Sequence, residues 1–189
     1  AASVARDFAG AVRGEIVAAQ RQGRAATLII PVGPVDPFPI LARALNENRT
    51  DCRDVMFINM DEYLDDADRW IPADHPLSFR GCMDRVFYQL LDPALAPLPQ
   101  NRIFPDPCAC DAIEDIIAQR GGVDACFGGL GINGHLAFNE PPEPGEDLSA
   151  GRFAALPTRV LSLTRETRTI NSVTVGGGLG IVPRRCVTI

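Results

Sequence analysis

The chain has 189 residues, of which 46% are hydrophobic, so it can form one ordinary domain with its own core. Its formal net charge of −6 disfavours binding to nucleic acid, which requires clustered positive charge. All 18 basic residues are arginines, which excludes Schiff-base chemistry on a lysine of this segment. We see neither a run of about 20 apolar residues nor a secretion signal, and we therefore expect a cytoplasmic protein without a membrane segment.

Helices and strands are predicted to alternate from the start of the chain. A helix is expected over residues 3–22, with Ser3 as its N-cap, and a strand over residues 26–31. The loop over residues 32–37 should lead into a second helix over residues 38–48.

The same pattern continues to the end of the chain. Further strands are predicted over residues 55–60, 123–127, 158–163 and 186–189, and further helices after Ser78 and over residues 111–119. Cys126, within an apolar strand, is expected to be a buried thiol. The alternation predicts an α/β fold, a Rossmann-like, mostly parallel sheet with helices on both faces. Because the chain stops inside an expected strand, we interpret residues 1–189 as a single domain whose C-terminal part is missing.

The most informative segment is residues 128–141, which reads Gly-Gly-Leu-Gly-Ile-Asn-Gly-His-Leu-Ala-Phe-Asn-Glu-Pro. A strand that leads into a glycine-rich turn lets the backbone approach a ligand closely. His135 and Glu140 should then stand at the edge of the sheet, where open α/β folds bind their ligands. Residues 129–134 also fit the dinucleotide pattern G-x-G-x-x-G, but Pro141 and the prolines after it would break the helix that such a site needs.

A pair of carboxylates follows the strand predicted over residues 55–60. Because neighbours on an extended chain point to opposite sides, either Asp61 or Glu62 should face the crevice at the end of this strand. A carboxylate there can act as a general base, although such an Asp often only caps a helix or forms a turn. His135 alone could equally be structural. Together, an Asp and a His at two strand ends could handle two different protons of one substrate.

Three motifs together resemble the glucosamine-6-phosphate deaminase (isomerase) family. They are Asn-Met-Asp-Glu-Tyr at residues 59–63, His-Pro-Leu-Ser-Phe at residues 75–79 and the glycine-rich segment at residues 129–141. Their order and spacing match over most of the chain. The resemblance implies amino-sugar catabolism, in which an aminosugar phosphate and water give fructose 6-phosphate and ammonia without a metal or an organic cofactor.

The resemblance also implies roles for single residues. Asp61 would be the base that moves a proton between C2 and C1 of the sugar, and His135 would open the pyranose ring by proton transfer at the ring oxygen. Glu140 would orient His135. Asn133 stands where the best-studied members have Asp, and an amide cannot take a proton, so any relay should rest on Glu140 and His135.

The binding residues implied by the resemblance are Gly33, Glu62, Gly129, Gly131, Gly134 and Arg159. The loop over residues 31–37 departs from the family pattern, because Pro34 lacks the N–H that a phosphate would use and Asp36 adds negative charge. Arg165 and Arg168 are candidate substitutes for phosphate binding. We therefore expect the proton-transfer half of the site to be kept and the phosphate half to be altered.

Two other functions also fit the sequence. A hydrolase like the related 6-phosphogluconolactonases would use His135 without Asp61, and a non-catalytic sugar-phosphate sensor would account for the altered loop. Cys108 and Cys110 lack further ligands nearby, so we expect reduced thiols and no metal site. His75 is interpreted as part of the pocket wall. The expected partner is a small sugar phosphate, and a homo-oligomer is compatible with the sequence.

Overall fold

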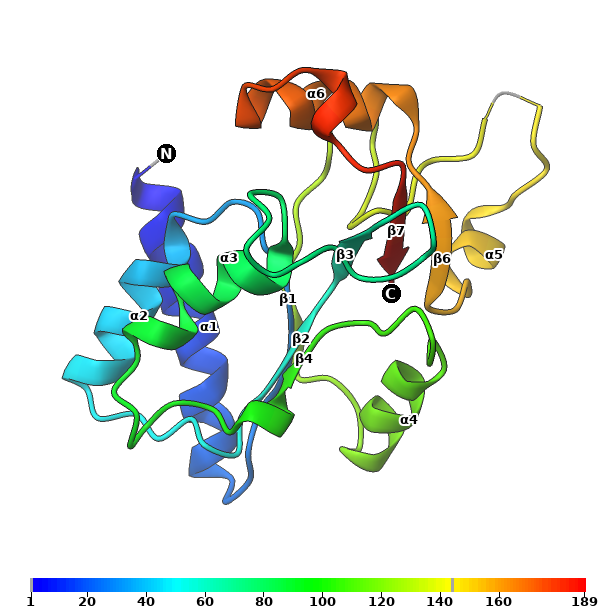
Figure 1. Cartoon of the computed structure of the whole chain (residues 1–189). Helices are drawn as coiled ribbons and strands as arrows, with labels where there is room; N and C mark the ends of the chain where they lie inside the picture. Colours follow the sequence, from blue (N-terminus) through cyan, green and yellow to red (C-terminus); the bar gives the residue numbers. More distant parts are fainter. Residues whose placement is uncertain (1, 144) are drawn as a thin grey trace.

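The computed structural model describes residues 2–143 and 145–189, and its strands form two sheets (Figure 1). The first sheet is parallel, with the strand order β4-β2-β1-β5. Its strands are β1 (Thr27–Ile30), β2 (Met56–Asn59), β4 (Arg102–Ile103) and β5 (Ala125–Cys126). The second sheet is antiparallel, in the order β3-β7-β6. It consists of β3 (Asp61–Leu64), β6 (Arg159–Ser162) and β7 (Arg185–Thr188).

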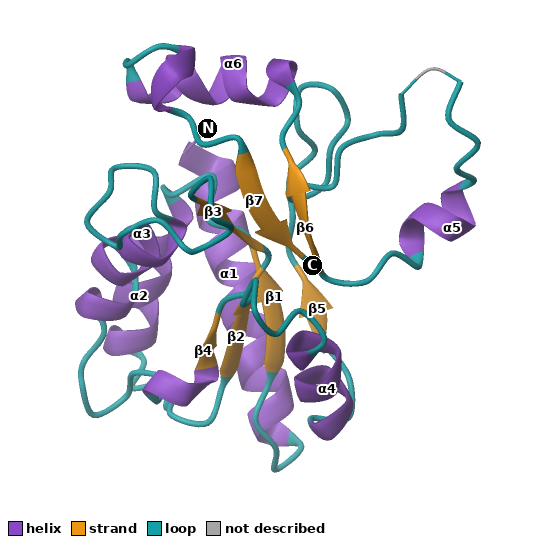
Figure 2. Ribbon diagram, turned by 45° about the vertical axis from the view of Figure 1, so that its right-hand side comes forward, coloured by secondary structure: helices purple, strands orange, loops and turns teal. Residues whose placement is uncertain are grey.

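Helices cover both faces of the parallel sheet (Figures 1 and 2). The helices α1 (Ala2–Arg21), α2 (Pro37–Glu47) and α3 (Phe79–Val86) share one core with Leu28 and Phe57. On the other face, α4 (Ala112–Gln119) packs Ile113 against Ile58. The two cores exist because successive side chains of a strand point to opposite faces. The predicted α/β fold, a mostly parallel sheet with helices on both faces, is confirmed.

The remaining helices are short or lie outside these layers. They are α5 (Ala150–Ala154), α6 (Arg165–Val175) and the single turns η1 (Tyr88–Leu90), η2 (Pro99–Asn101) and η3 (Leu179–Ile181). Helix α6 lies above the second sheet in Figures 1 and 2. Within the described parts of the chain, no helix has both the length and the apolar character needed to cross a bilayer.

Met60 joins the two sheets. Its N–H donates to the carbonyl of Ile30 at 3.3 Å, and its carbonyl accepts from the N–H of Ile189 at 3.0 Å. The chain thus passes from β2 directly into β3, whereas the sequence predicts only a strand that ends at residue 60. Asp and Glu have low strand propensity, so the sequence pattern does not predict β3. All four residues of this strand, Asp61–Leu64, are nevertheless buried.

Three further predictions are corrected by the structure. Helix α1 begins at Ala2, so Ser3 lies in its first turn and is not its N-cap. Cys126 is exposed, because its neighbours Ala125 and Phe127 turn toward the core and direct it to the opposite face of an edge strand. The late strands β6 and β7 exist, but β7 pairs antiparallel with both β3 and β6, so these strands do not extend the parallel sheet.

Candidate active site

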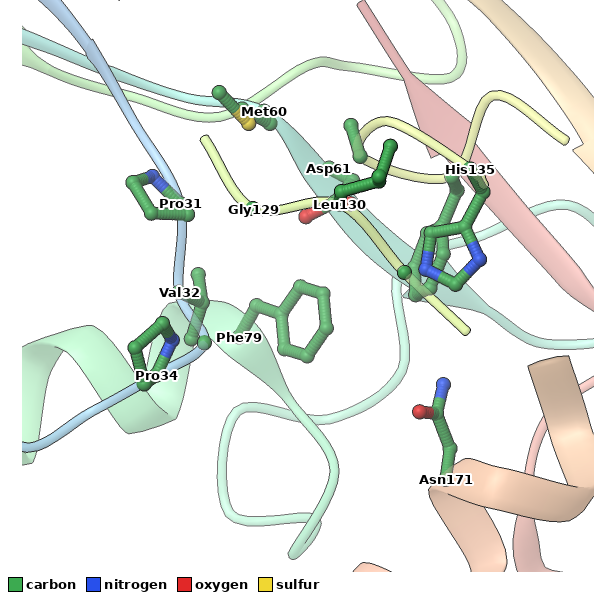
Figure 3. Close-up of a pocket in the computed structure, with 14 residues that line it drawn as sticks. Pro31, Val32, Pro34, Met60, Asp61, Phe79, Gly129, Leu130, His135 and Asn171 are labelled. Atoms are coloured by element: carbon green, nitrogen blue, oxygen red, sulfur yellow. The ribbon is translucent and has the colours of Figure 1, made fainter. Parts of the chain in front are cut away.

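A cavity of about 330 Å³ opens where the two sheets meet (Figure 3). It lies at the carboxyl ends of β1, β2 and β5, the edge at which open α/β sheets bind ligands. The segments that follow these strands line it, namely residues 31–34, residues 60–61 and residues 129–131. His135 and Asn171 complete the wall from the glycine-rich segment and from α6.

Asp61 faces this cavity from the first position of β3. It is only 6% exposed, and it belongs to the residues that line the opening. Burial, and to a smaller extent the neighbouring charge of Glu62, raises the pKa of Asp61 to about 8. A carboxylate of this kind can take up or release a proton near neutral pH.

Glu62 points away from the cavity, as expected for the neighbour of Asp61 on an extended chain. It is fully buried and accepts five hydrogen bonds. The donors are the N–H groups of Tyr63, Phe79 and Arg80, the hydroxyl of Ser78 and the guanidinium of Arg80. Glu62 therefore fastens β3 to the start of α3, and it does not line the cavity, whereas the resemblance implies a binding residue at this position.

His135 lies in a network of polar side chains. Its Nδ1 is 2.7 Å from Oδ1 of Asn133, whose amide nitrogen donates to Oε2 of Glu140 at 2.7 Å. The hydroxyl of Thr167 donates to the same carboxylate oxygen at 3.0 Å and lies 3.2 Å from Nδ1. The other oxygen of Glu140 accepts from the N–H and the hydroxyl of Thr164 at 3.2 and 3.0 Å.

This network determines which nitrogen of His135 carries the proton. The amide of Asn133 gives its N–H to Glu140, so its oxygen faces the imidazole and accepts from Nδ1. The backbone N–H of His135 donates to that oxygen as well, at 3.3 Å. In neutral His135, Nε2 is therefore the unprotonated nitrogen, available to a ligand.

Glu140 acts on His135 through intervening groups. The carboxylate oxygen is 3.8 Å from Nδ1, too far for a direct hydrogen bond, and Asn133 and Thr167 bridge the gap. Burial raises the pKa of Glu140, but the hydrogen bonds from Asn133, Thr167 and Thr164 outweigh it and hold this pKa below its usual value. The sequence analysis does not single out the two threonines, although Thr is a favoured N-cap residue and Thr164 caps α6.

The predicted glycines have different places in the site. Gly33, Gly129 and Gly131 line the cavity. A side chain at Gly131 would overlap the imidazole of His135, so this close approach requires glycine. Gly134 does not line the cavity, and its φ of 92° serves the tight turn in which its N–H donates to the carbonyl of Gly131.

The predicted phosphate-binding groups are not brought to the cavity. Arg159 lies on β6 and donates to the backbone carbonyl of Pro157. Arg168 lies within α6 and donates to the carbonyls of Leu179 and Val182. Arg165 and Asp36 are exposed, and His75 accepts a hydrogen bond within its own loop. Among the described residues that line the cavity none is an arginine, and the described residues contain no group of three His, Cys, Asp or Glu side chains that could hold a metal.

Known proteins with similar folds define the class of this chain. A monomeric glucosamine-6-phosphate deaminase matches it with a TM-score of 0.77 at 22% identity, over 98% of this chain and 71% of that one. The 6-phosphogluconolactonase from Thermotoga maritima matches with a TM-score of 0.65 at 15% identity, over 97% of this chain and 72% of that one. The chain thus has the α/β fold that these two kinds of protein share.

Sequence comparison narrows this class. No family model matches the chain. It is, however, 34% identical over 157 residues to the glucosamine-6-phosphate deaminase of Mycolicibacterium smegmatis, which covers 82% of this chain and 55% of that protein. The resemblance indicated by the motifs is therefore confirmed: the chain is a homologue of the glucosamine-6-phosphate deaminases. It spans little more than half the length of this curated relative.

Proposed function

We propose that the protein catalyses the isomerising deamination of an amino sugar, with glucosamine 6-phosphate, named in its relatives, as the reference substrate. The observation that carries this proposal is that Asp61 and His135, on the segments that follow β2 and β5, line one cavity. The homology supports the same reaction. Because the chain spans only part of its relatives, the activity is an inference from the site.

In this proposal Asp61 is the base. It removes the proton from C2 of the open-chain sugar, which gives an enolamine as the C1 oxygen takes up a proton. The proton then returns to C1, which converts the enolamine into an imine at C2 that water can hydrolyse. A pKa of about 8 makes the carboxylate a stronger base than an ordinary aspartate, while a minor fraction of the carboxyl groups stays ionised near neutral pH. Water then replaces the amino group, and ammonia leaves.

His135 opens the ring in this proposal. Its Nε2 takes up the proton of the C1 hydroxyl group, and the imidazole passes a proton to the ring oxygen as the ring C–O bond breaks. The hydrogen bonds of Nδ1 to Asn133 and Thr167 keep Nε2 free for this exchange. Glu140 supports the protonated imidazole through these two residues, in the manner of the third member of a catalytic triad.

A 6-phosphogluconolactonase-like hydrolase is the second candidate, because the Thermotoga maritima lactonase shares the fold. Such a hydrolase would use His135 but would not need a base at Asp61. The Asp61→Asn variant separates the two functions. Isomerisation should fall by about two orders of magnitude or more, whereas lactone hydrolysis should barely change.

A steady-state assay with glucosamine 6-phosphate tests the proposal. We expect ammonia and a ketose to appear in equal amounts, and we expect Asp61→Asn to abolish most of both. Hydrolysis of 6-phosphogluconolactone without ammonia release would favour the lactonase. Thermal stabilisation by the sugar without turnover would identify a sensor.

We also propose that the binding partner is a small sugar and not a nucleic acid. The net charge of −6 supports this choice, because nucleic acid requires clustered positive charge. A cytoplasmic location is proposed from the sugar-phosphate chemistry of the relatives alone.

A further inference from the structure

Three polar side chains line the cavity of the candidate site within the described parts of the chain, and two of them, Asp61 and His135, have roles in the proposed function. The third is Asn171, on α6. Figure 3 shows its side chain reaching from the helix toward the opening, with the amide at its tip. Because ligand cavities are mostly apolar, the few polar groups that face them fix the orientation of the ligand. Asn171 is therefore placed to orient the molecule on which Asp61 and His135 act.

Tyr63 fixes one end of this amide. The nitrogen Nδ2 of Asn171 donates to the hydroxyl of Tyr63 at 2.7 Å. Tyr63 lies two residues after Asp61 on β3, so both side chains leave the same face of the strand. Tyr63 is only 1% exposed, and its ring packs against those of Phe79 and Phe138, with centroids 5.0 and 4.9 Å away. The strand that carries Asp61 therefore also holds Asn171 in place.

Helix α6 presents Asn171 on the same face as Thr167. The two residues are four positions apart, which places their side chains one above the other on the helix. The hydroxyl of Thr167 lies 3.2 Å from Nδ1 of His135. One face of α6 thus contacts the imidazole with Thr167 and reaches the cavity with Asn171, one turn further along. The position of Asn171 is set by the same elements that position Asp61 and His135.

The oxygen of the Asn171 amide is the end that remains for a ligand. The nitrogen is engaged by Tyr63, and no donor from the described residues reaches Oδ1. A second cavity of about 310 Å³ adjoins the first at this point, and the two share Asn171 with the apolar side chains of Val32 and Phe79. A ligand that enters here displaces water from Oδ1. It must therefore supply a hydrogen-bond donor in return, since an unpaired polar group is costly to bury.

We propose that Asn171 is a substrate-binding residue whose amide oxygen accepts a hydrogen bond from a hydroxyl group of the sugar. The inference rests on the proposed function, in which the substrate is an amino-sugar phosphate and Asp61 and His135 serve C1, C2 and the ring oxygen. Because Asn171 lies in the wall shared with the second cavity, the hydroxyl is one beyond C2, on C3 or C4. This bond holds the sugar with C2 toward Asp61.

Replacement of Asn171 by leucine, which has a similar size but no polar end, tests this role. In Asn171→Leu, kcat/KM for ammonia release from glucosamine 6-phosphate should fall about tenfold, mainly through KM, because a binding interaction is lost. The matched control is Thr169→Leu, on the exposed side of the same helix, which should change neither constant. Tyr63→Phe removes the partner of Nδ2 but leaves Oδ1, so its effect should be smaller. An equal fall in Tyr63→Phe and Asn171→Leu would show that Asn171 only supports Tyr63.

Analogues of glucosamine 6-phosphate that lack the hydroxyl on C3 or on C4 identify the bonded group. In the wild type, one of them should have a kcat/KM about tenfold below that of the parent sugar. In Asn171→Leu the same analogue should come within about twofold of the parent, because the bond is already lost. Losses that multiply for both analogues would overturn the role of Asn171 while leaving the proposed function intact.

A binding measurement separates this inference from the proposed function. If the wild type releases no ammonia, the proposed function fails, and thermal stabilisation by glucosamine 6-phosphate tests Asn171 by itself. The stabilisation should be smaller in Asn171→Leu than in the control Thr169→Leu. Equal stabilisation of the two variants, or none in the wild type, would contradict a binding role for Asn171.

Discussion

Asp61 shows how one buried residue links stability to chemistry. Burial raises its pKa to about 8, whereas an aspartate in an unfolded chain titrates near ~3.9. Between these values the folded protein holds a proton that the unfolded chain releases. The resulting stabilisation is complete below pH ~4 and is lost as pH rises through about 8.

This linkage predicts a pH-dependent difference between the wild type and Asp61→Asn. From pH 5 to pH 9 the wild type should lose free energy of unfolding relative to the variant, by on the order of a few kcal/mol. Urea unfolding at a series of pH values measures the difference. Asp66→Asn, at an exposed position, is the control and should show no such trend. A difference for Asp61→Asn that does not vary with pH would contradict the burial of this carboxylate.

At the scale of elements, the start of α6 organises the His135 network. Thr164 is the N-cap of this helix, and its hydroxyl accepts from the N–H of Thr167 at 3.3 Å. Both threonines also donate to Glu140, so the position of the helix and that of the carboxylate are set together. Thr167 is thus a positioning residue, because its hydroxyl contacts both the imidazole of His135 and the carboxylate of Glu140.

Replacement of Thr167 tests this role. Thr167→Val should lower kcat about tenfold to a hundredfold with little change in KM, since such supporting hydrogen bonds orient the reacting group. Thr167→Ser, which keeps the hydroxyl, should restore most of kcat. Thr169→Val removes a hydroxyl from the exposed side of the same helix and should have no effect. Full activity in Thr167→Val, or no recovery in Thr167→Ser, would rule the role out.

Over the whole molecule, local motifs could be predicted from the sequence better than their surroundings. Asp61, His135 and Glu140 fall where the motifs indicate, because each lies next to a strand end or turn that the chain encodes locally. Glu62 could not be assigned this way, because its main partners arrive 16–18 residues later, with the start of α3. The antiparallel second sheet was also hidden, since it joins β3 to β7 from the far end of the chain.

The binding half of the site depends still more on tertiary structure. Sequence alone suggests Arg159 and Arg168 as anion ligands, yet both guanidiniums bind backbone carbonyls in the folded chain. A second, mostly apolar cavity lies beside the one lined by Asp61. Its wall comes from β3, the segment before α3, α6 and the loop after β1, so no single segment of the sequence predicts it.

The central claim is that Asp61 and His135 act on one substrate held between them. The most direct measurement is kcat/KM for ammonia release by the wild type, Asp61→Asn, His135→Gln and the double variant, with the sugar that the wild type prefers. In each single variant kcat/KM should fall by about two orders of magnitude or more. In the double variant kcat/KM should fall by less than the product of the two single losses, because both groups serve one reaction sequence. Wild-type kcat/KM in either single variant would contradict the account.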